Sequence, residues 1–366
     1  MVRRAFSCDD TILAYGRAVK ILVVRRDNIG DLICTTPLLA ALRRRHPEAW
    51  IGALVNSYNA PVLDRNPDLD AVFAYQKLKH LEPGESALAA LGRRAGMLWR
   101  LRQMRLDVVV LATPGLPARG LGLARWLKPR RIAGFDDGGA RTVALDLRVA
   151  LSSLDARHEV EQVFALAKLF DVEGGAPALV LVPDPREAEA ARALFAARPG
   201  RRIAVHISAR RRAQRWPAKC FAELIRRLAS DHGAQAMLLW SPGPADHPQH
   251  PGDDQKAAEV LNAIGSDRAM IPMVIPHPTA KLSSLLGALA ACDEVICSDG
   301  GAMHLAAALG KPIVALFGDS PVERWRPWGV RHRIVRPESR DVADVPVAAV
   351  LAAYAEIASA AGPRVS

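Results

Sequence analysis

Short apolar runs alternate along this chain with longer stretches in which apolar residues recur every three or four positions. The runs predict β-strands, and the longer stretches predict amphipathic helices. In the first half the predicted strands are residues 20–24, 50–55, 71–75, 107–111 and 131–134. The predicted helices that lie between or after them include residues 31–45, 85–103 and 158–170. This alternation predicts a parallel sheet covered by helices on both faces.

The second half of the chain repeats the alternation. Its predicted strands are residues 203–207, 236–240 and 273–275 and the runs that begin at Glu294 and Ile313. Its predicted helices are residues 217–232 and 281–291, a segment from Ala302, and residues 345–361. The last predicted helix is apolar enough to pack against another part of the protein. The surface of the first domain is one candidate.

Two segments rich in Gly and Pro, residues 173–177 and 183–185, separate the halves. We therefore expect two doubly wound domains, residues 1–178 and 183–366. In such domains a ligand binds at the carboxyl ends of the strands.

A glycine-rich turn follows one of the last predicted strands. It contains Ser298, Asp299, Gly300 and Gly301 directly before a predicted helix. Two glycines at a helix start let backbone N–H groups reach an anion, and the helix dipole favours negative charge there. The turn indicates a phosphate site, although an ordinary turn capped by Ser or Asp fits the same residues. His304 either faces this turn from within the helix or is an ordinary helical histidine.

A second polar turn, Asn28 to Asp31, follows the first predicted strand. Asp31 can cap the helix that begins there, with Gly30 beside it. The same position places a carboxylate at the ligand-binding edge, where it could accept a proton as a general base. The two roles oppose each other, because a helix N-terminus stabilises the carboxylate and weakens it as a base.

Two loops of the second domain carry further polar groups. One has four arginines in six residues, among them Arg211 and Arg215. It is either a phosphate clamp or a solvated charged surface. The other is a long Pro-rich loop, residues 240–254, which contains Gly243 and Asp253. Loops of this length are usually functional, and its carboxylates could bond ribose hydroxyls or cap the next helix.

The composition narrows the classes of function. The 49 lysines and arginines exceed the 38 aspartates and glutamates, so the net charge is +11 and the pI is about 9.8. A basic balance fits nucleic acid, an anionic membrane surface or phosphorylated substrates. No helix-turn-helix and no basic motif with interleaved aromatics supports nucleic acid. No run of 18 apolar residues predicts a membrane span.

The five cysteines show neither C-x-x-C nor zinc spacing. Cys292 and Cys297 lie in or beside a predicted buried strand and are interpreted as small core residues. An odd number of cysteines without a signal peptide indicates a reducing cytoplasm.

Several of these motifs together resemble glycosyltransferase family 9, the ADP-heptose:lipopolysaccharide heptosyltransferase family. The matching segments are Ile21-Leu-Val-Val-Arg25 with Gly30-Asp31 and Thr36-Pro37, then Arg215-Trp216-Pro217, then Asp299-Gly-Gly-Ala-Met-His304 with Leu305–Lys311 and Phe317-Gly318. The likeness runs from about residue 20 onward, and the Asp-x-Gly-x-x-His block is its most specific part.

The resemblance implies a GT-B fold, in which two Rossmann-like α/β domains face a central cleft. It implies an inverting enzyme, without metal or cofactor, that moves a heptose from ADP-heptose to a lipopolysaccharide core acceptor. Asp31 matches the general base of the family. Gly300 and Gly301 with nearby amides would hold the diphosphate in the second domain, and Asp299 and His304 match positions at the donor site.

By the same resemblance the first domain would bind the acceptor, an anionic glycolipid at the cytoplasmic face of the inner membrane. Candidate acceptor-binding residues are Gly30, Arg119, Arg125 and His158. Arg130 and Arg131 add positive charge near Arg125.

The chain departs from the family pattern in three places. Gln214 stands where the family often has Lys, so the positive charge would come from Arg215 or from one of Arg210–Arg212. Gly300 replaces a more usual Thr or Ser, and Pro114–Pro117 replaces a polar loop.

Two alternatives to heptose transfer stay open. One is a family 9 enzyme with another nucleotide sugar or a protein acceptor, and the other is a nucleotide-binding protein without catalysis. A dinucleotide oxidoreductase is disfavoured because no G-x-G-x-x-G follows the first strand of either domain.

Overall fold

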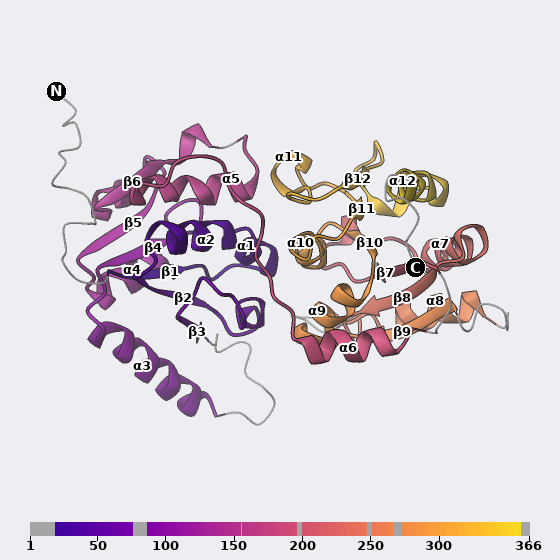
Figure 1. The fold of residues 1–366 in the computed structure, drawn as a ribbon, viewed down its shortest axis with the longest axis horizontal. Coiled ribbons are helices and arrows are strands. Elements are labelled where there is room, and N and C mark those ends of the chain that lie inside the picture. Colours follow the sequence, from indigo (N-terminus) through magenta and orange to yellow (C-terminus); the bar gives the residue numbers. More distant parts are fainter. Residues whose placement is uncertain are drawn as a thin grey trace. The chain divides into compact units, whose positions relative to one another are not determined.

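The chain forms two compact units, residues 1–180 and 181–366, each built on one parallel sheet (Figure 1). The computed structural model describes residues 19–75, 86–154, 156–195, 200–246, 251–265 and 273–359. Residues 1–18 and the ends of two predicted helices, residues 85 and 360–361, lie outside these ranges.

The sheet of the first unit has six parallel strands in the order β3-β2-β1-β4-β5-β6. The strands are β1 (Lys20–Val24), β2 (Trp50–Asn56), β3 (Ala71–Tyr75), β4 (Val108–Leu111), β5 (Arg131–Asp136) and β6 (Leu147–Ala150). The helices are α1 (Ile29–Ile33), α2 (Thr36–Arg45), α3 (Ala87–Gln103), α4 (Ala118–Leu127) and α5 (Glu159–Phe164), and a 3-10 helix, Ala165–Phe170, continues α5. The central strands β1 and β4 are almost wholly buried, which explains their unbroken apolar sequences.

The sheet of the second unit also has six parallel strands, in the order β12-β11-β10-β7-β8-β9. The strands are β7 (Arg202–His206), β8 (Gln235–Trp240), β9 (Val274–Pro278), β10 (Glu294–Ser298), β11 (Ile313–Leu316) and β12 (His332–Val335). The helices are α6 (Pro185–Ala193), α7 (Ala218–His232), α8 (Asp254–Ile264), α9 (Leu282–Ala291), α10 (Gly301–Ala308), α11 (Val322–Trp325) and α12 (Val347–Ser359). Cys292 and Cys297 are buried here, as predicted.

Each sheet has one point where the strand order reverses. In the first it lies between β1 and β4, where Val24 is in register with Leu111. In the second it lies between β7 and β10, where His206 is in register with Cys297. Loops that leave neighbouring strands at such a point diverge to opposite sides and leave a crevice for ligands. The turns after β1, β4, β7 and β10 are therefore the places to look for a site.

The single helix predicted at residues 31–45 is wrong, because the structure has two helices there and the first begins at Ile29. Pro37 has no N–H, and its ring would clash with the carbonyl of Ile33 in a continuous helix. The hydroxyl of Thr36 donates to that carbonyl at 2.8 Å, and the hydroxyl of Thr35 donates to the Asp31 carbonyl at 2.9 Å. The break isolates a short helix that carries Asp31.

The sequence pattern does not account for two edge strands or for where the last helix packs. The edge strands β6 and β12 have four residues each and no continuous apolar run, so the pattern does not predict them. The apolar side of α12 packs against α7, β11 and β12 of its own unit. In the described part of the chain, no helix is long and apolar enough to cross a membrane.

Candidate functional site

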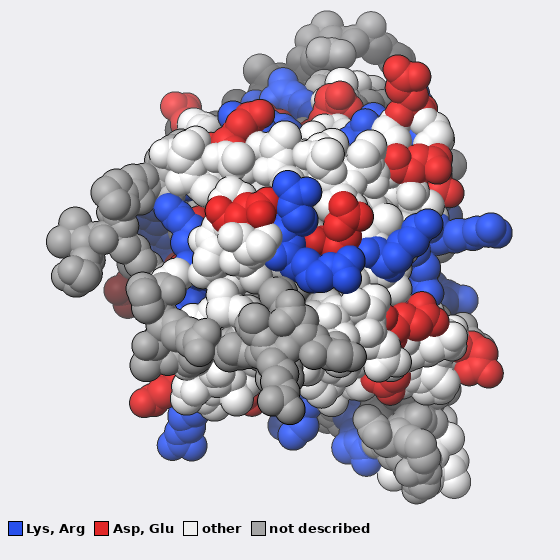
Figure 2. Space-filling model, turned by 90° about the vertical axis from the view of Figure 1, so that its right-hand side faces the viewer, with Lys and Arg blue, Asp and Glu red and all other residues white. Residues whose placement is uncertain are grey.

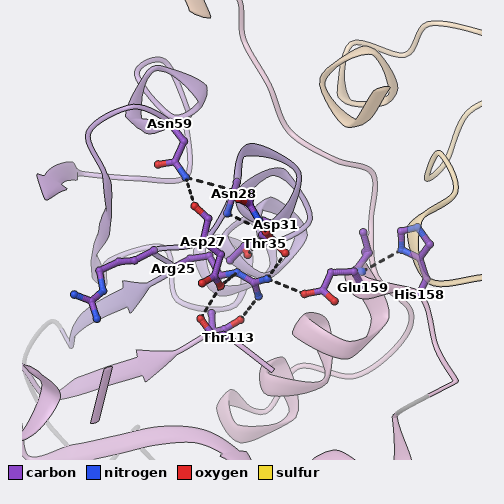
Figure 3. Close-up of polar contacts among 12 residues, drawn as sticks. Arg25, Asp27, Asn28, Asp31, Thr35, Asn59, Thr113, His158 and Glu159 are labelled. Atoms are coloured by element: carbon purple, nitrogen blue, oxygen red, sulfur yellow. Dashed lines mark hydrogen bonds and ion pairs between the residues drawn. The ribbon is translucent and has the colours of Figure 1, made fainter. Parts of the chain in front are cut away.

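The turn after β1 surrounds a buried guanidinium. Arg25 follows β1 directly and is only 2% exposed. Its Nη2 lies 2.9 Å from Asp31 Oδ1 and 2.7 Å from Glu159 Oε1, and its Nε lies 2.9 Å from Asp27 Oδ2. Its Nη1 donates to the carbonyl of Ala112, the residue after β4. Figure 3 shows the guanidinium between the three carboxylates.

One cation faces three carboxylates in this cluster, so the ionised cluster has an excess of negative charge. Burial acts to lower the pKa of Arg25, but Glu159, Asp31 and Asp27 outweigh it, and the pKa is raised. Glu159 has no exposed surface, and Arg25 pairs with its carboxylate. Arg25 is therefore a fixed positive centre that holds the carboxylates in place.

Asp31 is the third residue of α1, and both of its carboxylate oxygens are engaged. Oδ1 faces Arg25, and Oδ2 accepts from the backbone N and the side-chain Nδ2 of Asn28, each at 2.9 Å. Asn28 is the N-cap of α1, and Asp31 takes part in the cap from the third helical position by accepting the Asn28 backbone N–H. The side chain is still 12% exposed, so the carboxylate is oriented by the chain and open to solvent.

The four candidate acceptor-binding residues lie at different places in the first unit. Arg119 lines a cavity of about 250 Å³, which it shares with Asp27, Thr113 and Tyr75. The Thr113 hydroxyl donates to Asp27 Oδ2 at 2.9 Å, which connects this cavity to the Arg25 cluster. Arg125 is exposed on α4.

Gly30 and His158 are buried beside the same cluster. Gly30 lies within α1, next to Asp31. His158 precedes α5, is 2% exposed, and its Nδ1 accepts from the backbone N of Val160 at 3.1 Å. The ring of His158 thus caps the helix that presents Glu159.

The glycine-rich turn follows β10, and α10 begins at Gly301. Ser298 and Asp299 are 6% and 7% exposed. Burial raises the pKa of Asp299, against the opposing effect of hydrogen bonds from Ser320 and Gln214. His304 is 3% exposed, and its ring meets Trp325 edge-on with 5.9 Å between centroids.

Gln214 occupies the position where a lysine was expected and binds the turn directly. Its Nε2 donates to Asp299 Oδ2 at 2.9 Å and to Ser320 Oγ at 3.2 Å. The backbone at Gly318 lies very close to the backbone beside Gln214, since a Cβ on Gly318 would lie 2.2 Å from the Ala213 carbonyl oxygen. The amide therefore fixes the turn through hydrogen bonds and supplies no charge.

Arg211 and Arg215 of the basic loop after β7 have different partners. Arg211 pairs with Asp319 and donates to Ser320 Oγ at 3.3 Å, while its side chain is 48% exposed. Arg215 donates from Nε to the Ala209 carbonyl at 2.9 Å, and its Nη1 lies 3.8 Å from Asp253 Oδ1. The end of the loop is anchored by Trp216, which is 1% exposed.

The Pro-rich loop is closed at its base by Asp254. Its Oδ1 accepts from Trp240 Nε1 at 2.7 Å, and its Oδ2 accepts from the Gly243 backbone N at 2.8 Å. A Cβ on Gly252 would lie 2.1 Å from the Gly243 carbonyl oxygen, so the two arms of the loop approach closely. Asp253 is 3% exposed and faces Arg215. Residues 247–250 of the loop lie outside the described residues.

Sequence reasoning missed Arg25 as the centre of a network, Glu159 as its partner, and Lys256. Lys256 in α8 donates from Nζ to the Ile207 carbonyl at 2.8 Å. Burial lowers its pKa to about 8, while Asp253 acts in the opposite direction. Burial and Lys256 lower the pKa of His206 to about 4. The only local signal for Arg25 was its position directly after a buried strand.

Comparisons with known proteins point to one family. The sequence model of glycosyltransferase family 9 (heptosyltransferase) matches residues 97–348. Lipopolysaccharide heptosyltransferase 2 of Salmonella typhimurium is 25% identical over 338 residues, covering 87% of this chain and 88% of the relative. Lipooligosaccharide heptosyltransferase 2 of Haemophilus influenzae is 24% identical over 333 residues, with the same coverage.

Solved structures show the same fold. A family 9 glycosyltransferase from Veillonella parvula has a TM-score of 0.77 at 18% identity, covering 94% of this chain and 98% of the other. ADP-heptose lipopolysaccharide heptosyltransferase II of E. coli has a TM-score of 0.71 at 23% identity, covering 93% and 98%. The predicted fold, two Rossmann-like α/β units of the GT-B type, is confirmed.

Proposed function

Since this chain belongs to glycosyltransferase family 9, we propose that it transfers a heptose from ADP-heptose to a lipopolysaccharide core acceptor. Two kinds of relative support the substrate class. Those similar in sequence are named lipopolysaccharide heptosyltransferases, and a similar solved structure is an E. coli heptosyltransferase with ADP. The observation that carries the proposal is the Asp31 carboxylate, held at the carboxyl end of β1 by Arg25 and Asn28.

In the proposed reaction Asp31 accepts the proton of an acceptor hydroxyl. The hydroxyl oxygen attacks the anomeric carbon of the heptose as the bond from that carbon to the ADP oxygen breaks. A single displacement of this kind inverts the anomeric centre and needs no covalent intermediate. The contacts from Arg25 and Asn28 hold the carboxylate in one orientation, and the proton reduces the excess negative charge of the cluster.

The second unit would hold the nucleotide. Backbone amides at Gly300 and Gly301 start α10, where the helix dipole favours a diphosphate. Arg211 and Arg215 would replace their present carboxylate partners with phosphate oxygens and stabilise the leaving ADP without a metal. Ser298, Asp299 and His304 would shape the donor site.

The base and ribose would lie at the Pro-rich loop, where Asp253 faces Arg215 and the Gly243 backbone N donates to Asp254. The first unit would bind the acceptor at Gly30, Arg119, Arg125 and His158. We assign this acceptor to an anionic glycolipid, met by a peripheral enzyme at the cytoplasmic face of the inner membrane. The cavity that Arg119 lines also includes Asp27, one of the carboxylates that face Arg25.

The test is a transfer assay with ADP-heptose and purified lipopolysaccharide core acceptors, read as ADP release and as product mass. EDTA should leave the rate unchanged, and the new glycosidic bond should have the opposite anomeric configuration to the donor. UDP- and GDP-sugars should give no product. Transfer from one of them, or onto a protein, would assign a different substrate to the same fold. ADP binding with no transfer to any acceptor would favour a nucleotide-binding protein.

A further inference from the structure

Helix α3 is apolar on two opposite sides. Its buried side is formed by Ala90, Met97 and Leu101, which pack into the first unit. Leu88, Leu91 and Trp99 lie at positions i, i+3 and i+11, so they share the other side of the helix. They are 81%, 41% and 57% exposed. An ordinary surface helix has a single apolar stripe, and the second stripe here faces solvent.

Helix α4 extends this exposed apolar stripe. Trp126 near its end is 43% exposed. Between the two helices lies a groove of about 550 Å³, whose lining includes Leu91, Leu98, Trp99 and Trp126. Figure 1 shows α3 on the outside of the first unit. The two helices therefore present a continuous apolar surface with two tryptophans.

The same part of the sequence accounts for most of the net positive charge of the protein. Residues 86–135 contain ten lysines and arginines and one acidic residue, Asp107, so they carry +9 of the net +11. Asp107 is 2% exposed, which leaves the surface without an exposed carboxylate from this stretch. Arg93 and Arg100 are both exposed on α3, on the flank between the exposed apolar stripe and the buried side of the helix. By contrast, acidic and basic side chains are interspersed on the face shown in Figure 2.

We propose that this α3–α4 surface, formed by Leu88, Leu91, Trp99 and Trp126 with Arg93 and Arg100, docks on an anionic lipid membrane. Leucines and tryptophans enter the boundary between headgroups and acyl chains, where tryptophan is favoured. Arginines near the surface are attracted to the negative potential of an anionic bilayer. A second copy of this surface fits poorly, because two such stretches would bring like charges together.

The inference goes beyond the transfer reaction, because it concerns plain anionic lipid that carries no acceptor. Its benefit for catalysis rests on the proposed function, in which the acceptor is a glycolipid. Docking through α3 and α4 would keep the enzyme at the surface where that acceptor is embedded.

The experiment measures binding of the full chain to vesicles by co-sedimentation. Vesicles of phosphatidylcholine with phosphatidylglycerol are compared with vesicles of phosphatidylcholine alone. Leu88→Glu with Trp99→Glu should weaken binding to the anionic vesicles by at least about tenfold. Val143→Glu is the matched control, since Val143 is 84% exposed in the same unit but lies outside this surface. It should bind like the wild type.

A second pair of variants tests the charge. Arg93→Gln with Arg100→Gln should weaken binding and reduce its dependence on salt, whereas Arg226→Gln with Arg227→Gln, exposed on α7, should change neither. Equal binding by all variants, or equal binding to neutral vesicles, overturns the proposal. Self-association or DNA binding that the same variants abolish, without vesicle binding, assigns the surface to those partners instead.

The outcome is separable from that of the proposed function. The vesicle variants should still transfer heptose to a soluble, deacylated acceptor. If the wild type transfers no heptose but shows the predicted vesicle binding, the proposed function fails and the docking surface stands. If transfer occurs and the variants bind vesicles normally, the docking surface fails alone.

Discussion

The two candidate ligand-binding edges of this protein hold their charges in different ways. At the carboxyl end of β1, Arg25 is 2% exposed and is surrounded by three carboxylates within 2.9 Å. At the carboxyl end of β7, Arg211 is 48% exposed, and Arg215 lies 3.8 Å from its nearest carboxylate. The first edge is a closed ionic network, and the second is an open set of cations beside backbone amides.

This difference matches two different tasks. A proton acceptor must keep one orientation, which a buried guanidinium enforces on Asp31. A site that binds and releases a phosphate-rich group needs cations whose partners can be exchanged. The contrast predicts that substitutions at the first edge affect stability and proton transfer, while those at the second affect nucleotide affinity.

The largest effect on stability is expected from Arg25→Met. It would remove the guanidinium that faces the carboxylate of Glu159, which has no exposed surface. Chemical denaturation should show a loss of about 3–5 kcal/mol in the free energy of unfolding. Arg43→Met is the matched control, because its partner Asp70 is 41% exposed and the pair should contribute at most about 1 kcal/mol.

The double variant Arg25→Met with Glu159→Leu should recover part of the loss, since the buried charge is then removed. Similar small losses for Arg25→Met and Arg43→Met would show that the network at the first edge does not stabilise the fold.

A smaller, pH-dependent effect is expected at Lys256. Burial lowers its pKa in the folded protein to about 8, from 10.5 in the unfolded chain. Between these values the unfolded chain binds more protons, so the contribution of Lys256 to stability rises with pH. Relative to Lys256→Met, the free energy of unfolding of the wild type should rise by roughly 1–2 kcal/mol from pH 8 to pH 9.5.

Thermal or chemical unfolding of the wild type and of Lys256→Met between pH 8 and pH 9.5 measures the difference in their free energies of unfolding. Titrating groups that the two proteins share contribute equally and cancel in this difference. A difference that does not change with pH would mean that Lys256 is solvated in the folded protein.

The smallest effect is expected on nucleotide affinity, from Gly301→Val. A branched side chain at the start of α10 would block access to the backbone amides, and calorimetry should show ADP binding at least about tenfold weaker, or 1.4 kcal/mol. The melting temperature should change much less. Gly122→Val in α4 is the control, since a Cβ there meets no atom within 4 Å. Unchanged ADP affinity in Gly301→Val would place the diphosphate elsewhere, with the basic loop as the next candidate.

Much of the structure at the two edges could be predicted from the sequence, because the strands and turns that form them have local sequence patterns. The strands β1 and β3 were predicted to the residue from their continuous apolar runs, and β1 is buried as such runs indicate. Asp31 and Gly301 lie at the starts of the helices that follow β1 and β10, so their place at the carboxyl ends of the strands could also be predicted.

The rest depends on contacts between distant parts of the chain. Arg25 and Glu159 are 134 residues apart, and Lys256 is 49 residues from the carbonyl that it binds. The spacing of apolar residues along the sequence does not reveal which distant residues will pair. The break between α1 and α2 was within reach of sequence reasoning, because Pro37 excludes a continuous helix.

The central claim is that Asp31 at the first edge takes the proton while the second edge holds the nucleotide. Its most direct test is Asp31→Asn, assayed for heptose transfer and for ADP affinity in the same preparation. We predict a fold that stays intact, an ADP affinity equal to that of the wild type, and a transfer rate lower by roughly 10²–10⁴-fold. Normal turnover, or a loss of stability that accounts for the whole loss of activity, would contradict the account and leave Asp31 with its capping role alone.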